Sequence, residues 1–471
     1  MLNQAKNIFL VGIKGVAMAN LASILQKMGK SVLGSDVSEE FITEELLKKN
    51  SIRVQRGFLS SDLPENTDLV IYSSGHQGQE NPQVLEAKKR AIKTITQAEF
   101  LGELAKQFRT TIAVCGCHGK TTASSLLAYA LKKLGAKPSY MVGSSQFNNL
   151  PGGDYEGNDY FVVEADEYGV NPPYDLTPKF HFLDPDYILC TNIDFDHPDV
   201  YKDLTHTQEV FLKFFYKRKL ILCADDGPTI QTVNSLDRKQ YTTYGYLHHA
   251  DAEISHVKTI AQGSSFKLTI GGHLRGVLEA GFTIKLSGEK NISNTAGVVL
   301  TLLQLGFSTE KIRDAIKDFS GAKRRFELIS VIGETYLFDD YAHHPKEISA
   351  TIKAARVRFP KRKIVVIFQP HTYSRTQAFI PDFASSLGLA DKTYILPIFP
   401  SARENVKSFK VSSSDIARLN PDKIVYVDSR RELLKHLTSY IKQSEVIFTM
   451  GAGDVYKLKE EIIPLLRSKA A

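Results

Sequence analysis

The residues most suited to chemistry form a short phosphate-binding pattern, Gly116-Cys117-His118-Gly119-Lys120-Thr121-Thr122. Small residues allow backbone N–H groups to close around phosphate oxygens, and a following helix would add the positive end of its dipole. We expect Lys120 to reach the β- and γ-phosphates of a nucleotide and the Thr121 hydroxyl to ligate Mg²⁺. The full P-loop pattern would have Gly where this chain has Val114. The alternative is therefore a Gly-rich turn that carries Gly-Lys-Thr by chance.

Two further side chains follow apolar runs in the same part of the chain. Glu164 opens the acidic run Glu164-Ala165-Asp166-Glu167, and His197 lies shortly after the apolar run at 187–190. Because the carboxyl ends of parallel strands meet at one edge of a sheet, we expect Glu164 and His197 to join Thr121 around Mg²⁺. The alternatives are an acidic turn for Glu164 and a structural role for His197.

The first residues that follow an apolar run are Gly12-Ile13-Lys14-Gly15-Val16-Ala17-Met18. Asp36 ends a second run, and Ser73 and Ser74 follow a third. A GxGxxG fingerprint is absent, so a nicotinamide cofactor is disfavoured. We expect a diphosphate at this helix N-terminus, with simple packing as the alternative.

Polar motifs also follow the apolar runs of the C-terminal part. They are Lys323-Arg324-Arg325-Phe326-Glu327, Asp339-Asp340-Tyr341-Ala342-His343-His344-Pro345, Gln369-Pro370-His371-Thr372-Tyr373-Ser374-Arg375 and Gly451-Ala452-Gly453-Asp454. Each motif is ambiguous by itself. Adjacent histidines usually point in different directions, so His343 and His344 are a weak indication of a metal site. We also expect Lys120, lying in a phosphate loop, to be solvated when no nucleotide is bound.

These motifs need strands and helices to bring them together. Short apolar runs that end in Gly or polar clusters alternate with helical periods, which is typical of parallel α/β units. We predict strands at 7–11, 31–33, 69–72, 111–115, 160–163, 187–190, 220–224, 335–338, 364–368, 393–396, 424–427 and 445–449. A small antiparallel hairpin is predicted from 266–270, a Gly271-Gly272 turn and 273–278. The units divide the chain into three domains, residues 1–104, 105–322 and 323–471.

Composition limits the class of protein. The chain has 471 residues, of which 42% are hydrophobic and 24% charged, as in folded proteins. We find no uncharged apolar stretch of the length that spans a membrane and no signal peptide. Four cysteines without a CxxC pair fit a reducing cytoplasm and no disulfide or zinc framework. The formal charge of +7 is spread along the chain, which favours an ordinary surface, or anionic small molecules, over nucleic acid.

Taken together and in order, the motifs resemble those of the Mur ligases of peptidoglycan synthesis. The match includes residues 12–18, 116–122, 164–167, 191–197, 288–294, 324–327, 340–345 and 369–376, and it covers essentially the whole chain. The resemblance implies an α/β protein of three domains. The N-terminal domain would be Rossmann-like and bind a UDP-sugar. The central domain would carry a P-loop-type parallel sheet with a small antiparallel patch and bind ATP. The C-terminal domain would be Rossmann-like and bind ATP and an amino acid.

The resemblance also implies roles for individual residues. UDP-sugar contacts would come from Gly12, Gly15, Met18, Asp36, Ser73 and Ser74. ATP contacts would come from residues 116–122, Asn291, Asn294, Arg325 at the γ-phosphate and Asp340 at the ribose. Amino-acid contacts would come from Tyr341, His343, His371 and Arg375, with Arg375 holding the carboxylate. Lys120, Arg325 and His197 would be catalytic, and Thr121, Glu164 and His197 would hold Mg²⁺.

The implied reaction is the ATP-dependent ligation of L-alanine to UDP-N-acetylmuramate through an acyl phosphate. We expect a cytoplasmic monomer or weak homodimer with no nucleic-acid partner and no membrane insertion. The main alternative joins a whole tripeptide to the same sugar in cell-wall recycling. Its pattern after the run at 364–368 resembles Glu-Pro-Arg-Ser-Asn, whereas this chain has Gln369-Pro370-His371-Thr372-Tyr373-Ser374-Arg375, which favours L-alanine. A nucleotide-binding scaffold without activity is disfavoured by the intact Gly119-Lys120-Thr121, Glu164, His197 and Arg325. An NAD(P) oxidoreductase is a third alternative, disfavoured by the absence of GxGxxG.

The chain departs from the family pattern at several positions. Cys117 stands where Thr is usual, Lys290 where His is usual, and Phe58 and Gln97 replace a usual His and Arg. Residues 168–186 form a longer connection than usual. We expect the phosphate loop to tolerate Cys117, because backbone groups cradle the phosphates.

Overall fold

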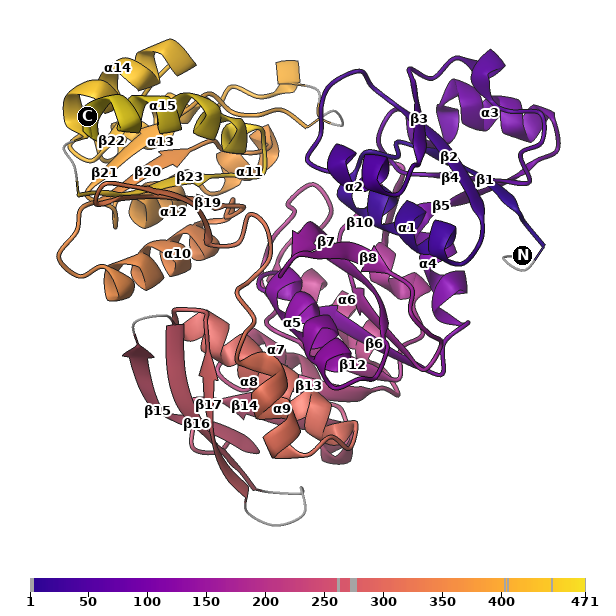
Figure 1. Ribbon diagram of the computed structural model, residues 1–471, viewed down its shortest axis with the longest axis horizontal. Helices are drawn as coiled ribbons and strands as arrows, with labels where there is room; N and C mark the ends of the chain where they lie inside the picture. The colour runs from indigo at the N-terminus through magenta and orange to yellow at the C-terminus, as the bar shows by residue number, and fades with distance from the viewer. Residues whose placement is uncertain are drawn as a thin grey trace.

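The computed structural model describes residues 4–260, 263–271, 278–401, 404, 406–441 and 444–470. Three main sheets follow one another along the chain, each with helices against it (Figure 1). The N-terminal and C-terminal parts lie at the two upper corners of Figure 1, with the central part below them. This three-part α/β architecture confirms the predicted fold class. The domain boundaries at 104/105 and 322/323 stay a prediction.

The N-terminal sheet is entirely parallel, with strand order β3-β2-β1-β4-β5. Strand order reverses at β1, so the turn that follows it lies at the switch point where α/β sheets bind ligands. The predictions missed β3 and β5, which are short and partly exposed. The elements are β1 (Asn7–Val11), α1 (Val16–Lys27), β2 (Ser31–Asp36), α2 (Glu44–Lys49), β3 (Arg53–Arg56), η1 (Ser60–Asp62), β4 (Leu69–Tyr72), η2 (Gly78–Glu80), α3 (Pro82–Lys89), β5 (Lys93–Thr96) and α4 (Gln97–Ala105).

The central sheet has ten strands in the order β17-β16-β15-β14-β13-β12-β6-β9-β7-β8. Strands from β15 to β7 pair in parallel, and the antiparallel pairs lie at the two edges. Its elements are β6 (Thr110–Cys115), α5 (Lys120–Lys133), β7 (Ser139–Phe147), β8 (Leu150–Asp154), β9 (Tyr160–Glu164), β10 (Gly169–Asn171), β11 (Asp175–Pro178), η3 (Lys179–Phe182), β12 (Tyr187–Cys190), α6 (Leu204–Phe215), β13 (Lys219–Cys223), α7 (Gly227–Val233), η4 (Arg238–Gln240), β14 (Tyr241–Gly245), β15 (Ala252–Ile260), β16 (Gly263–Ile270), β17 (Leu278–Ile284), α8 (Glu289–Gln304) and α9 (Thr309–Ile316). The strands β10 and β11 form a separate antiparallel pair.

The predicted hairpin is confirmed in its antiparallel pairing and wrong in the position of its second strand. The strand β16 pairs with β17, which begins at Leu278, where the prediction ended. The predicted Gly272 turn position and residues 273–277 lie outside the described residues. The strands β7, β8, β14 and β15 were not predicted from the sequence.

The C-terminal sheet has the order β18-β19-β23-β20-β21-β22, and only the edge strand β18 runs antiparallel. Every predicted strand of this part is found within one or two residues of its predicted ends, whereas the half-exposed β18 was missed. The elements are β18 (Glu327–Ile332), β19 (Thr335–Asp340), α10 (Pro345–Arg358), β20 (Ile364–Phe368), α11 (Tyr373–Ala378), α12 (Ile380–Leu387), β21 (Lys392–Ile395), η5 (Val406–Ser408), α13 (Ser413–Arg418), β22 (Ile424–Tyr426), α14 (Arg430–Tyr440), β23 (Val446–Met450), η6 (Val455–Leu458) and α15 (Lys459–Ala470).

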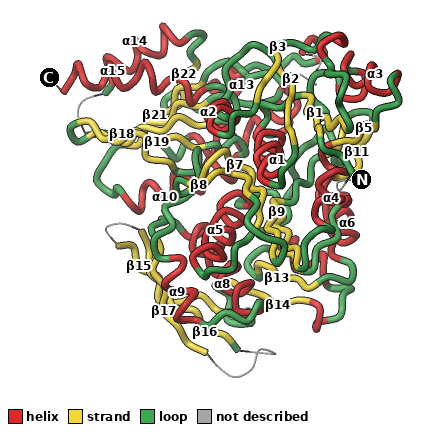
Figure 2. The backbone as a smooth tube through the Cα atoms, turned by 45° about the vertical axis from the view of Figure 1, so that its right-hand side comes forward, coloured by secondary structure: helices red, strands yellow, loops and turns green. Residues whose placement is uncertain are grey.

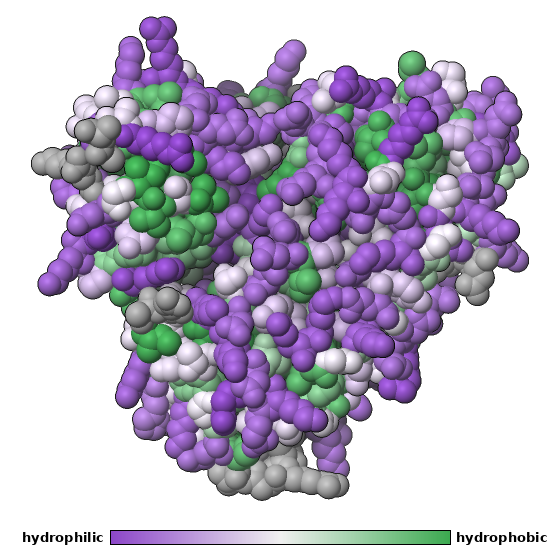
Figure 3. All heavy atoms as spheres, viewed as in Figure 1, coloured by the Kyte–Doolittle hydropathy of each residue, from purple (hydrophilic) through white to green (hydrophobic). Residues whose placement is uncertain are grey.

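The three parts are in direct contact. Helix α1 lies against β7 and β8, so the N-terminal and central parts share one apolar core (Figures 1 and 2). The face drawn in Figure 3 is mainly hydrophilic, with hydrophobic side chains in separate groups. Over the part of the chain that the structure describes, no helix has the length and apolarity needed to cross a bilayer. All four cysteines are buried and free.

Candidate functional site

The predicted phosphate loop joins the buried strand β6 to helix α5, and two of its glycines are required by geometry. Gly116 and Gly119 have φ of +124° and +88°. A Cβ at Gly116 would lie 2.3 Å from Thr191 Oγ1, and one at Gly119 would lie 2.9 Å from Asn294 Nδ2. Thr191 and Asn192, which follow β12, donate to the His118 carbonyl at 2.6 and 2.7 Å. Neighbouring segments therefore hold the loop in its shape.

Lys120 is engaged by protein groups and is not solvated, which corrects the expectation from the sequence. Its Nζ donates to Glu167 Oε2 at 2.7 Å and Oε1 at 2.9 Å, and to the Gly116 carbonyl at 2.6 Å. Burial alone would lower the pKa of Lys120, but the Glu167 carboxylate outweighs it and raises this pKa. Burial raises the pKa of Glu167 to about 7 despite the attraction of Lys120. The two hydrogen bonds make Glu167 the direct partner of the loop lysine.

Two of the three predicted metal ligands, Thr121 and Glu164, are in direct contact, whereas the third, His197, lies beside Glu167. Glu164 accepts hydrogen bonds from the Thr121 hydroxyl at 3.1 Å, the Ser124 hydroxyl at 3.2 Å and the Gly143 N–H at 2.6 Å. His197 instead lies beside Glu167, with Nε2 3.8 Å from Oε1. The structure thus brings Thr121 and Glu164 together as expected and links His197 to the loop through Glu167. Sequence reasoning gave Glu167 no role, although it lies in the same acidic run as Glu164.

Arg325 reaches the phosphate loop from the C-terminal part of the chain. Its Nη2 donates to Thr121 Oγ1 at 3.2 Å, and its Nη1 lies 3.7 Å from Glu347 Oε1. Asp340 is buried and accepts from the Phe326 and Ala342 N–H groups at 3.1 and 2.8 Å. Burial raises the pKa of Asp340 to about 6, and Arg325 opposes this rise.

A cleft of about 950 Å³ runs between the central and C-terminal parts beside this contact. Most of the residues predicted to bind ATP line it, together with Lys290; these are His118, Gly119, Thr122, Asn291, Asn294, Arg325 and Asp340. Cys117 points elsewhere, because its thiol donates to the Asp194 carbonyl at 3.1 Å. The departure at Cys117 therefore does not face the cleft.

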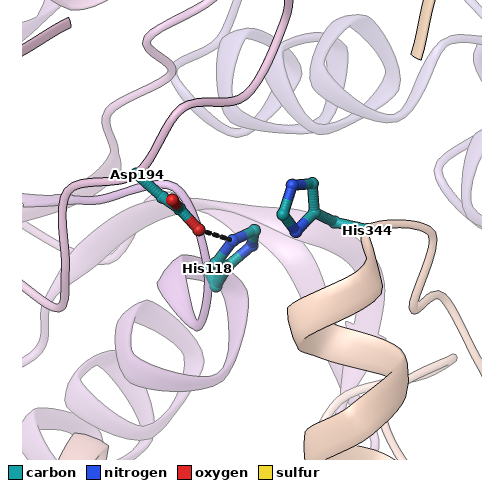
Figure 4. Close-up of side chains that lie close together, drawn as sticks. All are labelled: His118, Asp194 and His344. Atoms are coloured by element: carbon teal, nitrogen blue, oxygen red, sulfur yellow. Dashed lines mark hydrogen bonds and ion pairs between the residues drawn. The ribbon is translucent and has the colours of Figure 1, made fainter. Parts of the chain in front are cut away.

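A polar cluster of His118, Asp194 and His344 lies where the central and C-terminal parts meet (Figure 4). His118 Nε2 lies 3.2 Å from Asp194 Oδ2, and His118 Nδ1 lies 3.4 Å from Glu347. Burial alone would lower the pKa of His118, but the Asp194 and Glu347 carboxylates beside its two ring nitrogens raise it to about 9. The charged imidazole therefore bridges the two domains.

The cluster has three groups within metal-binding distance, but its hydrogen bonds argue against a metal. His344 Nδ1 accepts the Lys346 N–H at 3.3 Å and thereby caps helix α10. Because burial lowers the pKa of His344 to about 4, its ring is neutral and Nε2 carries the proton. Metal binding at Nε2 would require the proton to move to Nδ1, which would remove this helix cap. Lys346 also occupies Asp194 Oδ1 at 2.7 Å. We interpret the cluster as an electrostatic contact between domains.

The residues predicted to bind the amino acid gather next to His197. The rings of Tyr341 and His343 lie 5.2 Å apart, and those of His343 and His371 lie 6.5 Å apart. Arg375 donates to His197 Nδ1 at 3.3 Å and to Asp196 Oδ1 from two nitrogens. Its guanidinium thus already has an anionic partner, Asp196, which the sequence did not indicate.

In the N-terminal part, Gly12, Asp36 and Ser73 meet at the carboxyl ends of β1, β2 and β4. A Cβ at Gly12, where φ is +80°, would lie 2.7 Å from Ser73 Oγ. Asp36 accepts the Lys14 N–H at 2.7 Å, so it shapes the turn before α1. Gly15 is the N-cap of α1, and Ser74 follows Ser73 at the same edge. Met18 is different, because its side chain is buried in the apolar core.

Comparisons with known proteins agree with this geometry. The Mur ligase catalytic domain matches residues 7–109, the Mur ligase middle domain residues 114–302 and the Mur ligase glutamate ligase domain residues 324–453. UDP-N-acetylmuramate–L-alanine ligases of Desulfitobacterium hafniense and Lactobacillus johnsonii are 34% and 36% identical to this chain. These alignments cover 97% and 99% of this chain, and 99% and 100% of the relatives.

Solved structures show the same fold. The UDP-N-acetylmuramate-alanine ligase of Thermotoga maritima has a TM-score of 0.78 at 25% identity, covering 98% of this chain and 99% of that protein. A murein peptide ligase of Psychrobacter arcticus has a TM-score of 0.74 at 23% identity, covering 98% of both chains, and supports the fold alone. The full-length match at more than 30% identity and the order of the three domains lead to one conclusion: this chain belongs to the Mur ligase family.

Proposed function

We propose that this protein ligates L-alanine to UDP-N-acetylmuramate in the cytoplasm, with ATP as the energy source, in peptidoglycan precursor synthesis. The observation that carries the proposal is the contact of Arg325 with Thr121, which builds a phosphoryl-transfer site from two domains. Relatives of the same length, each named for this reaction, support the choice of substrates.

The chemistry follows from the poor electrophilicity of a carboxylate. The lactyl carboxylate of the sugar attacks the γ-phosphorus of ATP, and ADP leaves. The amine of L-alanine then attacks the carbonyl carbon of the acyl phosphate, and phosphate leaves. Both steps need charge neutralisation and the exclusion of water. Lys120 and Arg325 supply positive charge at the phosphate loop, and closure of the C-terminal domain over the cleft excludes water.

Mg²⁺ is the metal that fits the donors at the loop. The Thr121 hydroxyl and the carboxylates of Glu164 and Glu167 are oxygen ligands, which Mg²⁺ prefers, and His197 adjoins them. When bound, Mg²⁺ would neutralise charge that develops on the transferred phosphoryl group. We therefore keep Thr121, Glu164 and His197 as proposed ligands and add Glu167.

The remaining assignments are proposals of the same kind. Gly12, Gly15, Asp36, Ser73 and Ser74 would hold the UDP-sugar, with Met18 contributing only through its backbone. Tyr341, His343, His371 and Arg375 would hold L-alanine, and the cleft residues together with the phosphate loop would hold ATP. The domain limits 1–104, 105–322 and 323–471 and a monomer or weak homodimer complete the proposal.

The test is release of ADP by the purified protein with UDP-N-acetylmuramate and a panel of amines. We expect ADP release that requires both the sugar nucleotide and L-alanine. A tripeptide that outperforms L-alanine would favour the cell-wall recycling reaction instead. Absence of amine-dependent ADP release with every amine would point to a nucleotide-binding protein without this activity.

A further inference from the structure

A bulge in strand β7 brings all three domains to one point. β7 pairs with β8 at Met141 and again at Gln146, but the corresponding β8 partners are Gly153 and Pro151. Pairing of β7 with β9 also ends at Met141. Residues 142–145, here called the β7 bulge, therefore have no strand partner on either side within the described residues.

Asn20 of helix α1 supplies hydrogen bonds that the sheet does not. Its Nδ2 donates to the Val142 carbonyl at 2.8 Å and to the Ser144 carbonyl at 3.0 Å. Asn20 is fully buried, and β8 makes room for it: Cβ atoms at Gly152 and Gly153 would lie 2.6 Å from Asn20 Nδ2 and 2.4 Å from the Asn20 carbonyl oxygen. Asn20 thus holds the β7 bulge from the N-terminal domain.

The residue between these two carbonyls holds the proposed metal carboxylate. The Gly143 N–H donates to Glu164 Oε2 at 2.6 Å, and a Cβ at Gly143 would lie 2.3 Å from Glu164 Oε1. The other Glu164 oxygen accepts from the Thr121 hydroxyl at 3.1 Å. A displacement of the β7 bulge would therefore move Glu164 relative to the phosphate loop.

The same segment also joins the C-terminal domain. The Lys323 N–H donates to the Gln146 carbonyl at 2.9 Å, and Ser144 Oγ lies 3.4 Å from the Lys323 carbonyl. Arg325, which contacts Thr121, is two residues further along. The β7 bulge is thus continuous with the segment that delivers the arginine to the loop.

One feature of Asn20 distinguishes coupling from simple stabilisation. Its Oδ1 is buried and has no hydrogen-bond partner among the described residues. An unpaired buried acceptor weakens the folded state, so the side-chain oxygen of Asn20 does not account for this residue. What only Asn20 supplies is the pair of donors that fixes the β7 bulge relative to α1.

We propose that Asn20 is a positioning residue that couples UDP-sugar binding at the start of α1 to the geometry of Glu164 in the ATP site. This inference rests on the proposed function. Asn20 lies five residues after Gly15, about 7 Å along the helix, so an adjustment of α1 by the diphosphate reaches the β7 bulge directly. Coupling of this kind is reciprocal: each ligand should tighten the binding of the other by the same factor.

The experiment measures the coupling factor, which is the ratio of the affinities for the ATP analogue with and without UDP-N-acetylmuramate, in the absence of turnover. Binding of Mg²⁺ with a non-hydrolysable ATP analogue is titrated calorimetrically, with and without saturating UDP-N-acetylmuramate. For the wild type we expect tightening in the range of about 5- to 150-fold. For Asn20→Leu we expect a factor near one and each ligand alone binding within a few-fold of wild type. The unfolding temperature should fall, because the Val142 and Ser144 carbonyls lose their donor. Asn20→Ser keeps one donor and should give an intermediate factor, which preserves the test if the leucine variant does not fold.

Ser23→Ala is the matched control, because Ser23 is a buried polar residue of the same helix. Its hydroxyl accepts a hydrogen bond from Asn50 Nδ2, inside the N-terminal domain, at 3.2 Å. Ser23→Ala should keep the wild-type factor. The inference would be overturned if the wild type showed no tightening of one ligand by the other, or if Asn20→Leu showed as much tightening as the wild type. Either result would leave the proposed function intact. Failure of the wild type to bind UDP-N-acetylmuramate at all would overturn the proposed function and the inference with it.

Discussion

Arg375 and Asp196 form an ion pair between the C-terminal and central domains, with Arg375 Nε and Nη2 donating to Asp196 Oδ1 at 3.0 and 2.8 Å. Their side chains are only 4% and 5% exposed. Burial alone would raise the pKa of Asp196, but Arg375 outweighs it and holds this pKa well below its usual value. The residue proposed to bind the substrate carboxylate therefore also joins the two domains that enclose the reaction.

Arg375→Lys should raise the KM for L-alanine strongly and leave the KM values for ATP and UDP-N-acetylmuramate within a few-fold. Lysine cannot reproduce the paired N–H groups of the guanidinium, and the loss should cost about 2–4 kcal/mol of transition-state binding. Steady-state kinetics with each substrate varied in turn measures the effect. Arg418→Lys, on the exposed face of α13, is the control. Equal increases in all three KM values would assign Arg375 to the domain contact alone.

The amino-acid specificity of the wild type should be limited. Glycine and L-serine should be poorer substrates than L-alanine by about 10- to 200-fold in kcat/KM, since one methyl or hydroxyl gives little discrimination. Competition between amino acids, analysed by mass spectrometry of the products, measures these ratios. Rejection of glycine by several further orders of magnitude would contradict this account of the site.

Lys120→Ala should remove nearly all activity, because the ammonium neutralises charge on the transferred phosphoryl group. It should also destabilise the fold by about 1–3 kcal/mol, since it leaves the buried Glu167 carboxylate without its partner. The double variant Lys120→Ala/Glu167→Gln should recover stability in urea unfolding but not turnover. If Lys120→Ala retained near-normal turnover, ATP would not bind where we propose.

Variants of the proposed metal ligands should change the Mg²⁺ requirement more than the affinity for UDP-N-acetylmuramate. Glu164→Ala, Glu167→Gln and His197→Ala remove groups beside the phosphate loop, whereas the sugar nucleotide is held by another domain. Raising Mg²⁺ should partly restore the activity of at least one of them. Mg²⁺ titrations of the initial rate provide the measurement, and unchanged curves for all three would assign these residues to structure.

The His118 contact should make stability depend on pH on the alkaline side. The pKa of His118 is raised to about 9 in the folded protein, against about 6.5 when unfolded. Its ion pairs therefore stabilise fully below about pH 6.5, progressively less up to pH 9, and not at all above it. Between these limits the wild type should lose on the order of 3 kcal/mol more than His118→Gln in urea unfolding. The exposed His248→Gln should behave like the wild type, and parallel pH profiles for wild type and His118→Gln would contradict the bridging role.

The sequence predicted features that depend on local pattern and missed those that depend on tertiary contact. The phosphate loop was predictable because a buried strand, two glycines and a helix lie together in the chain. The strands β3, β5 and β18 were missed because half-exposed edge strands lack a continuous apolar run. Asp196 and Asn20 carry no local signal of their roles, and the only signal for Glu167 is its place in the acidic run that begins at Glu164. Their partners lie far along the chain, and Lys120 was expected to be solvated for the same reason.

The central claim is best tested by following oxygen from the sugar carboxylate. UDP-N-acetylmuramate labelled with ¹⁸O in its lactyl carboxylate is incubated with ATP, Mg²⁺, L-alanine and the purified protein, and the products are analysed by mass spectrometry. We predict UDP-N-acetylmuramoyl-L-alanine, ADP, and inorganic phosphate that carries one ¹⁸O atom from the carboxylate. Phosphate without ¹⁸O, or a product formed only when a tripeptide replaces L-alanine, would contradict the account.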